Sequence, residues 1–212
     1  MTAIMQQGGW VMWPLLALSV LAVAVICERA MFYGSLGFPS SKLGRVLNEA
    51  LSSRDREALD AVLPVTHPIF GRYFGELRRI GCQKDVESTE RTQEVLDIFA
   101  QEIAARLDSR LPLLGVIVRV APLIGLFGTV IGMINTFSRL AATQGGVDLM
   151  VLADGIWQAL LTTAAGLTIA IPALLIQYWF LARKKRVIEA LYRMTSAVFA
   201  LEGENVGRNH AA

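Results

Sequence analysis

The residues of this chain that could do chemistry are hydroxyl and amide side chains set among small residues in two apolar stretches. The first stretch carries Thr129 and Asn135, and the second carries Gln158, Thr162 and Thr163. Hydroxyls and amides donate and accept hydrogen bonds but do not titrate near neutral pH. Such a pattern is typical of helix packing in lipid or of a polar pathway across a membrane, and composition leaves both interpretations open.

The sequence shows no catalytic or metal-binding constellation beside these residues. It contains no nucleophile–base pair, and the run G-L-F-G-T-V-I-G lacks the Lys-Ser/Thr of a phosphate loop. Cys27 and Cys82 lie far apart without metal-ligand spacing, and His67 and His210 are isolated. We therefore expect a protein that is not an enzyme and has no catalytic residues, metal or cofactor.

The hydrophobic pattern predicts an all-α membrane protein with three transmembrane helices. The chain has 212 residues, of which 54% are hydrophobic and 18% charged, against about 25% charged in soluble domains. Three apolar runs exceed the roughly 20 residues that cross a bilayer. The first is too long, and lacks the preceding basic residues, for a cleaved signal peptide. We place the three spans at residues 11–33, 113–140 and 155–182.

The charge distribution predicts how these spans are oriented. Twelve of the 20 Lys and Arg residues lie between Arg29 and Arg110, and six more follow Leu181. Basic segments flanking spans stay on the cytoplasmic side, so an inverted topology is disfavoured. We expect a periplasmic N-terminal tail and a periplasmic loop, and a cytoplasmic helical region and C-terminal helix. These four segments are residues 1–10 and 141–154, and residues 34–112 and 183–212.

Helical periodicity continues beyond the second and third spans. Apolar residues from Val95 to Leu114 recur at spacings of three and four, which predicts one long helix from about residue 85 to residue 140. The third span continues as an amphipathic helix through Ile188 and Leu191. The second and third helices are therefore expected to extend into long cytoplasmic helices.

Small residues and prolines mark the same two spans. Gly125, Gly128 and Gly132 would let helix backbones approach closely, and Gly128-x-x-x-Gly132 is a common packing spacing. Pro122 and Pro172 are expected to bend their helices. Neither span holds Asp, Glu or His in its interior, so any passing proton would need a titratable group from another polypeptide.

The two polar spans carry a family resemblance. The segments A-P-L-I-G-L-F-G-T-V-I-G-M-I-N-T-F (121–137) and G-I-W-Q-A-L-L-T-T-A-A-G-L-T-I-A-I-P-A (155–173) closely resemble the MotA/TolQ/ExbB proton-channel family, on the ExbB/TolQ side. The predicted topology resembles that family over the whole chain. The short cytoplasmic region is unlike that of the flagellar MotA-type members.

The resemblance implies a homopentameric ring around a pair of transmembrane helices from a single-span ExbD/TolR-like partner, which supplies a membrane aspartate. Such a complex uses the proton-motive force to drive work at the outer membrane or periplasm, often with a TonB- or TolA-like protein, from the bacterial inner membrane. Thr129 and Thr163 match the family's paired threonines that face this aspartate. We expect the proton pathway to be lined by five residues, namely Thr129, Thr163, Gln158, Thr162 and Gly166.

The sequence departs from the family pattern at Gln158, where ExbB and TolQ proteins commonly carry a glutamate. An amide does not titrate, so proton handling would rest on the partner's aspartate. The same departure favours an alternative, a non-conducting oligomeric scaffold that anchors a partner protein. A small-solute transporter is a weaker alternative, because three spans show neither a repeat nor a charged substrate site.

Overall fold

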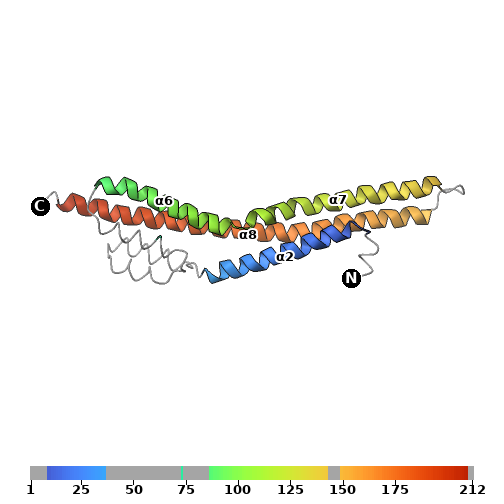
Figure 1. Ribbon diagram of the computed structural model, residues 1–212, viewed down its shortest axis with the longest axis horizontal. Helices are drawn as coiled ribbons and strands as arrows, with labels where there is room; N and C mark the ends of the chain where they lie inside the picture. Colours follow the sequence, from blue (N-terminus) through green and yellow to red (C-terminus); the bar gives the residue numbers. More distant parts are fainter. Residues whose placement is uncertain (1–8, 37–72, 74–85, 143–148, 210–212) are drawn as a thin grey trace. The chain divides into compact units, whose positions relative to one another are not determined.

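The computed structural model describes residues 9–36, 73, 86–142 and 149–209. In this part of the chain every regular element is an α-helix (Figure 1). The helices are α2 (Met12–Ser35), α6 (Val86–Asp108), α7 (Leu111–Ala142) and α8 (Leu149–Asn209). Three apolar segments within Met12–Ser35, Glu94–Ala142 and Leu149–Arg193 are long enough to cross a membrane, which confirms the prediction of three membrane-length helices.

Several predicted features lie outside the described residues. They are most of the N-terminal tail, most of the predicted cytoplasmic region between the first two spans, the centre of the loop between the second and third spans, and the last three residues. Pro122 and Pro172 lie inside α7 and α8, and the helices continue on both sides of them. The predicted bends at these prolines stay predictions.

The prediction of one unbroken helix from residue 85 to residue 140 is wrong. Helix α6 ends at Asp108 and α7 begins at Leu111. Between them Arg110 adopts a left-handed backbone conformation with φ of 66°, the geometry that commonly ends a helix. Pro112 supplies a further reason, since it has no N–H to bond the carbonyl of Asp108.

The chain divides into two compact units. The first consists of Met1–Ala30 and Arg110–Phe180, and the second of Met31–Ser109 and Leu181–Ala212. In the first unit α7 runs beside the first half of α8 along a line of contact that we call the seam (Figure 1). Its α7 members are Gly125, Gly128, Gly132 and Thr136, and its α8 members are Gly155, Ala159, Thr162 and Gly166.

The seam brings the two helix backbones unusually close. A Cβ atom on Gly166 would lie 2.7 Å from the carbonyl oxygen of Ala121 and 3.2 Å from the Cα of Gly125. One on Gly125 would lie 2.9 Å from the carbonyl oxygen of Thr162. In lipid, where burial of apolar surface does not drive helices together, such close packing is a main source of association.

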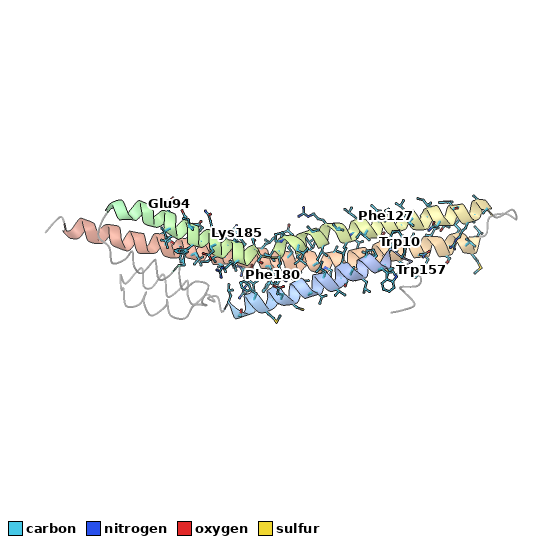
Figure 2. The ribbon with its side chains drawn as sticks, in the orientation of Figure 1. Trp10, Glu94, Phe127, Trp157, Phe180 and Lys185 are labelled. Atoms are coloured by element: carbon cyan, nitrogen blue, oxygen red, sulfur yellow. The ribbon has the colours of Figure 1, made fainter. Side chains whose placement is uncertain are left out.

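Helix α2 covers one side of the seam. Leu15 packs with Ala121 of α7 and Ala170 of α8, and this small core is flanked by half-buried apolar residues. These flanking residues are Met12, Leu18, Ile124, Ala165 and Ile169. At the start of α2 the ring of Trp10 meets that of Phe127 edge-on, with centroids 6.3 Å apart (Figure 2).

The second unit is held by polar contacts between helices. Lys184 of α8 pairs with Asp108 of α6 at 2.5 Å, and the hydroxyl of Tyr33 donates to the carbonyl of Leu107 at 3.2 Å. Tyr73 is 1% exposed. Its hydroxyl donates to the carbonyl of Leu191 at 3.2 Å and also contacts the hydroxyl of Thr195.

We predict that Gly166→Ala destabilises the protein. The added methyl group would meet the backbone oxygen of Ala121, which can move only if a helix moves. Overpacking of this kind costs about 1–3 kcal/mol, so the thermal unfolding midpoint in detergent should fall. The control is Gly34→Ala in α2, where nothing lies within 4 Å of the new methyl group. Equal midpoints for the two variants would contradict the close contact.

We predict that Tyr73→Phe removes part of the alkaline sensitivity of folding. Burial raises the pKa of Tyr73 above its usual value of 10.0. A raised folded-state pKa gives stability that is fully present below the unfolded-state pKa and is lost as the pH rises through the folded-state pKa. The variant should lose about 1 kcal/mol near pH 8 but decline less steeply above pH 10 than the wild type. Unfolding midpoints of the variant and the wild type between pH 8 and pH 11 test this.

Candidate functional site

Two threonine hydroxyls converge on one backbone carbonyl at the centre of the seam. Thr162 donates to the carbonyl of Ala159 at 2.7 Å and, with weaker geometry, to that of Gly125 at 3.3 Å. Thr163 donates to the same Gly125 carbonyl at 3.2 Å. Because Gly125 has no side chain, α8 can approach closely enough for both bonds. The carbonyl lies one helical turn before Thr129, whose hydroxyl donates to Leu126 at 2.7 Å.

Burial separates the predicted pathway residues into two groups. Thr162 is 1% exposed and Gly166 is also buried, and both lie against α7. Helix α7 covers these two residues in the single chain, and their place in a proton pathway stays a prediction. Thr129 and Thr163 are only half-buried, so their hydroxyl oxygens lie at the edge of the seam.

The two half-buried threonines lie on the side of the seam that α2 leaves open. Successive helical residues are rotated by about 100°, so Thr129 lies about 140° around α7 from Ile124. Ile124 packs toward α2. By the same geometry Thr163 lies about 160° around α8 from Ala165, which also packs toward α2. The structure therefore brings Thr129 and Thr163 to one face, as their resemblance to a threonine pair predicts.

The surface directly around Thr129 and Thr163 is apolar. Leu126 and Leu167 beside them are 56% and 43% exposed. Each threonine uses its hydroxyl proton on a helix carbonyl, so each oxygen is left as a hydrogen-bond acceptor. Such a pair can accept a hydrogen bond from a protonated carboxyl group or a water molecule, but it cannot itself take up or release a proton.

The structure does not bring Gln158 together with the threonine pair. Its Nε2 lies 3.2 Å from the position that a Cβ on Gly9 would occupy, just before α2. Gly9 has a φ of 69°, a conformation that favours glycine. Five residues before Thr163, Gln158 points about 140° away around α8. In the single chain it therefore lies at the α2 side of the seam, and its role in a proton pathway stays a prediction.

A polar group near the start of α7 was not predicted from the sequence. The Nε2 of Gln177 and the Nη2 of Arg119 lie 2.7 Å and 3.6 Å from the position of a Cβ on Gly115. The sequence gives little indication of this group, because a single amide and a single arginine near the end of a span commonly extend to the lipid headgroups.

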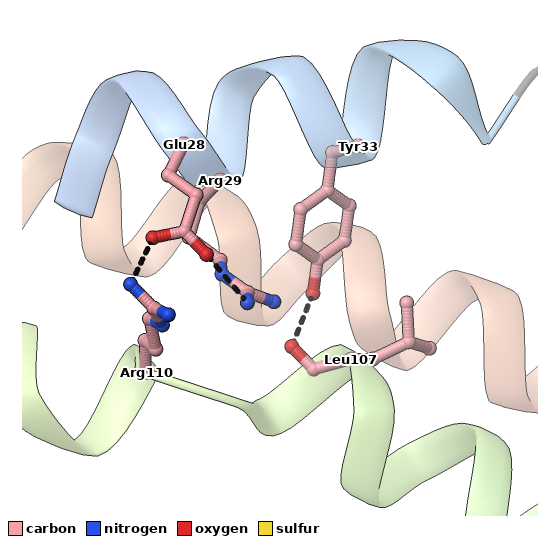
Figure 3. A network of polar contacts seen from close by, with 5 residues as sticks. All are labelled: Glu28, Arg29, Tyr33, Leu107 and Arg110. Atoms are coloured by element: carbon pink, nitrogen blue, oxygen red, sulfur yellow. Dashed lines mark hydrogen bonds and ion pairs between the residues drawn. The ribbon is translucent and has the colours of Figure 1, made fainter. Parts of the chain in front are cut away.

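Charged residues in the first unit gather where α7 begins. Glu28 of α2 pairs with Arg110 and also contacts Arg29 at 3.4 Å (Figure 3). Arg29 is 5% exposed. The remaining described carboxylate of this unit, Asp154, lies exposed in the second turn of α8. The described membrane-embedded residues near the threonine pair therefore include no carboxylate.

Comparison with known proteins identifies the family. The family model described as the MotA/TolQ/ExbB proton channel family matches residues 65–193. The ExbB-like protein 1 of Synechocystis sp. is 35% identical over 172 residues, covering 80% of this chain and 66% of that protein. Biopolymer transport protein exbB1 of Vibrio cholerae is 34% identical over 172 residues, covering 79% and 73%. The Tol-Pal system protein TolQ of Pseudomonas aeruginosa is 35% identical over 127 residues, covering 58% and 54%.

The chain belongs to the MotA/TolQ/ExbB proton channel family and is an ExbB/TolQ-like subunit. With its three membrane-length apolar helices, it is a multi-pass protein of the bacterial inner membrane. It spans about two thirds of the Synechocystis relative and about half of the TolQ protein.

Proposed function

We propose that this chain forms the proton-channel ring of an inner-membrane motor driven by the proton-motive force. The observation that carries the proposal is the placement of Thr129 and Thr163 on one face of the seam, opposite α2. Five copies would turn this face inward around an ExbD/TolR-like partner with one membrane span. The N-terminus would lie in the periplasm, and the second unit in the cytoplasm.

The partner would supply the titrating group, because residues 111–142 and 155–180 contain no Asp, Glu or His. A protonated aspartate of the partner would donate a hydrogen bond to the hydroxyl oxygen of Thr129 or Thr163 and keep its proton. Loss of that proton on the cytoplasmic side would end the hydrogen bond and let the ring and the partner shift relative to each other. One charge that crosses 100 mV releases about 2.3 kcal/mol, enough to bias a choice between neighbouring helix packings.

The work would reach the outer membrane or the periplasm through the partner, with a TonB- or TolA-like protein. The relatives named for biopolymer transport and for the Tol-Pal system support this direction of coupling. Helix α2 would then lie at the outside of the ring as a lipid-facing anchor. Exposed apolar residues on α2 such as Val20, Val23 and Met31 suit that position.

A non-conducting scaffold is the second candidate function. The absence of a carboxylate near the threonine pair, with Gln158 in place of the common glutamate, favours it. Proton flux into vesicles that hold the chain together with its single-span partner separates the two functions. A motor subunit conducts protons when a potential is applied, whereas a scaffold binds the partner and leaves the vesicles impermeable to protons.

We predict that Thr129→Val and Thr163→Val each lower proton flux about tenfold, which corresponds to about 1.4 kcal/mol. Valine keeps the shape of threonine but cannot accept a hydrogen bond from a carboxyl group. Fluorescent pH indicators inside partner-containing vesicles would report the flux. The matched control is Thr168→Val, since Thr168 is exposed on another face of α8 and bonds only its own helix, at Ala164.

Partner binding measured on the same samples gives the proposal a second readout. The threonine variants should still bind the partner, because each loses one hydrogen bond to it. Unfolding midpoints check the seam, since Thr163→Val also loses the bond to the Gly125 carbonyl. Wild-type flux in both threonine variants would contradict the proposal. Reduced flux in Thr168→Val would show that loss of any hydroxyl disturbs these helices.

A further inference from the structure

Arg119 is a charged residue in the apolar helix α7, about two turns from its first residue. It lies eight residues after the first residue of α7 and is the only charged residue between Leu111 and Ser138. An ionisable side chain within a membrane span is costly, and it marks a functional site for which a counter-charge should be sought.

The side chain of Arg119 is folded back along α7. Its Nε donates to the carbonyl of Gly115 at 3.1 Å, and Gln177 of α8 reaches the same place from the other side. The guanidinium of Arg119 and the amide of Gln177 thus both lie next to Gly115. The Gln177 amide lies 2.7 Å from the position of a Cβ on Gly115, so it would have to move aside for any larger residue there.

The terminal nitrogens of Arg119 form no hydrogen bond or ion pair with the described part of the chain. Among the described residues of this unit, a second copy of the chain also offers no acid that could pair with Arg119. Glu28 is engaged by Arg110. Asp154 lies near Thr136, toward the far end of α7. Thr136 follows Arg119 by seventeen residues, which is about 25 Å along the helix, so Asp154 is far from Arg119.

The polar group lies on the same face as the threonine pair. In a straight helix Gly115 is rotated by about 40° from Thr129 and by about 180° from Ile124. Ile124 packs toward α2. The face that we propose to turn toward the partner therefore carries hydroxyls at one level and a guanidinium with an amide at another.

We propose that Arg119 and Gln177 form a binding site for a second carboxylate of the single-span partner, which fixes the partner's depth in the ring. This inference rests on the proposed function. A guanidinium can hold a carboxylate through two parallel hydrogen bonds, and the Gln177 amide can donate another. The pairing would set the partner's helix so that its titrating acid stays level with Thr129 and Thr163.

The helical rise predicts where the second carboxylate lies. Arg119 and Gly115 are ten and fourteen residues from Thr129, which is about 15 and 21 Å along the helix. In a helical partner the second acid therefore lies about ten to fourteen residues from the titrating one, toward the end of the span at which α7 begins.

The test uses the full chain co-expressed with its single-span partner. We expect Arg119→Gln to weaken binding of the partner about tenfold or more, and Arg119→Glu to weaken it further through repulsion, while Arg119→Lys keeps part of it. Arg139→Gln is the matched control, because Arg139 is the other arginine of α7 and lies in its last turn. A charge reversal of the partner's acid to lysine within the predicted window should restore binding to Arg119→Glu.

Two results would overturn the inference. One is wild-type binding of the partner by Arg119→Gln. The other is rescue of Arg119→Glu only by lysine substitutions of partner acids outside the window. Should Arg119→Glu fail to fold, Arg119→Gln and Arg119→Lys decide the matter, with the unfolding midpoint as the check on folding. If the wild type neither binds the partner nor passes protons, the proposed function itself fails. If the wild type does both and Arg119→Gln is unchanged, this inference alone fails.

Discussion

The close approach of α7 and α8 along the seam is the constraint on which the rest of the first unit depends. Backbone atoms of Gly125 and Gly166 come so near that a methyl group on either would meet a carbonyl oxygen of the other helix at 2.9 or 2.7 Å. Only at this separation can the hydroxyls of Thr162 and Thr163 reach across to the Gly125 carbonyl. Packing and interhelical hydrogen bonding thus reinforce each other, as membrane helices require.

Helix α2 makes the two sides of the seam unequal. By packing on Ala121 and Ala170 through Leu15, it closes one side with apolar side chains. Gln158, which lies next to Gly9, belongs to that side. The other side keeps half-buried hydroxyls on a surface of exposed leucines. An unequal pair of faces is what a ring needs if lipid is to contact one side of each copy and a partner the other.

The start of α7 shows how charge and backbone geometry act together at the end of a span. Arg110 adopts a left-handed backbone conformation, which costs about 1–2 kcal/mol for a residue with a side chain. Its guanidinium forms an ion pair with Glu28 of α2. Arg119 lies further along the same helix with its terminal nitrogens unused by the described residues. The charge of Arg110 is paired within the chain, and for Arg119 we propose a pair with a carboxylate of the partner.

The sequence by itself determined the class of protein, because three apolar runs of membrane length and the absence of acids near the threonines are properties of composition and order. Through motifs that resemble a family, it also predicted that Thr129 and Thr163 form a pair. Only the tertiary structure decided that Thr162 and Gly166 are covered by α7, that Gln158 lies on the side of α2, and that the helix breaks at Arg110. The physical reason for the first two is that helical periodicity places residues around one helix but does not determine which face packs against a neighbouring helix. The break was missed because Arg110 and Pro112 leave the apolar periodicity on either side of it unchanged.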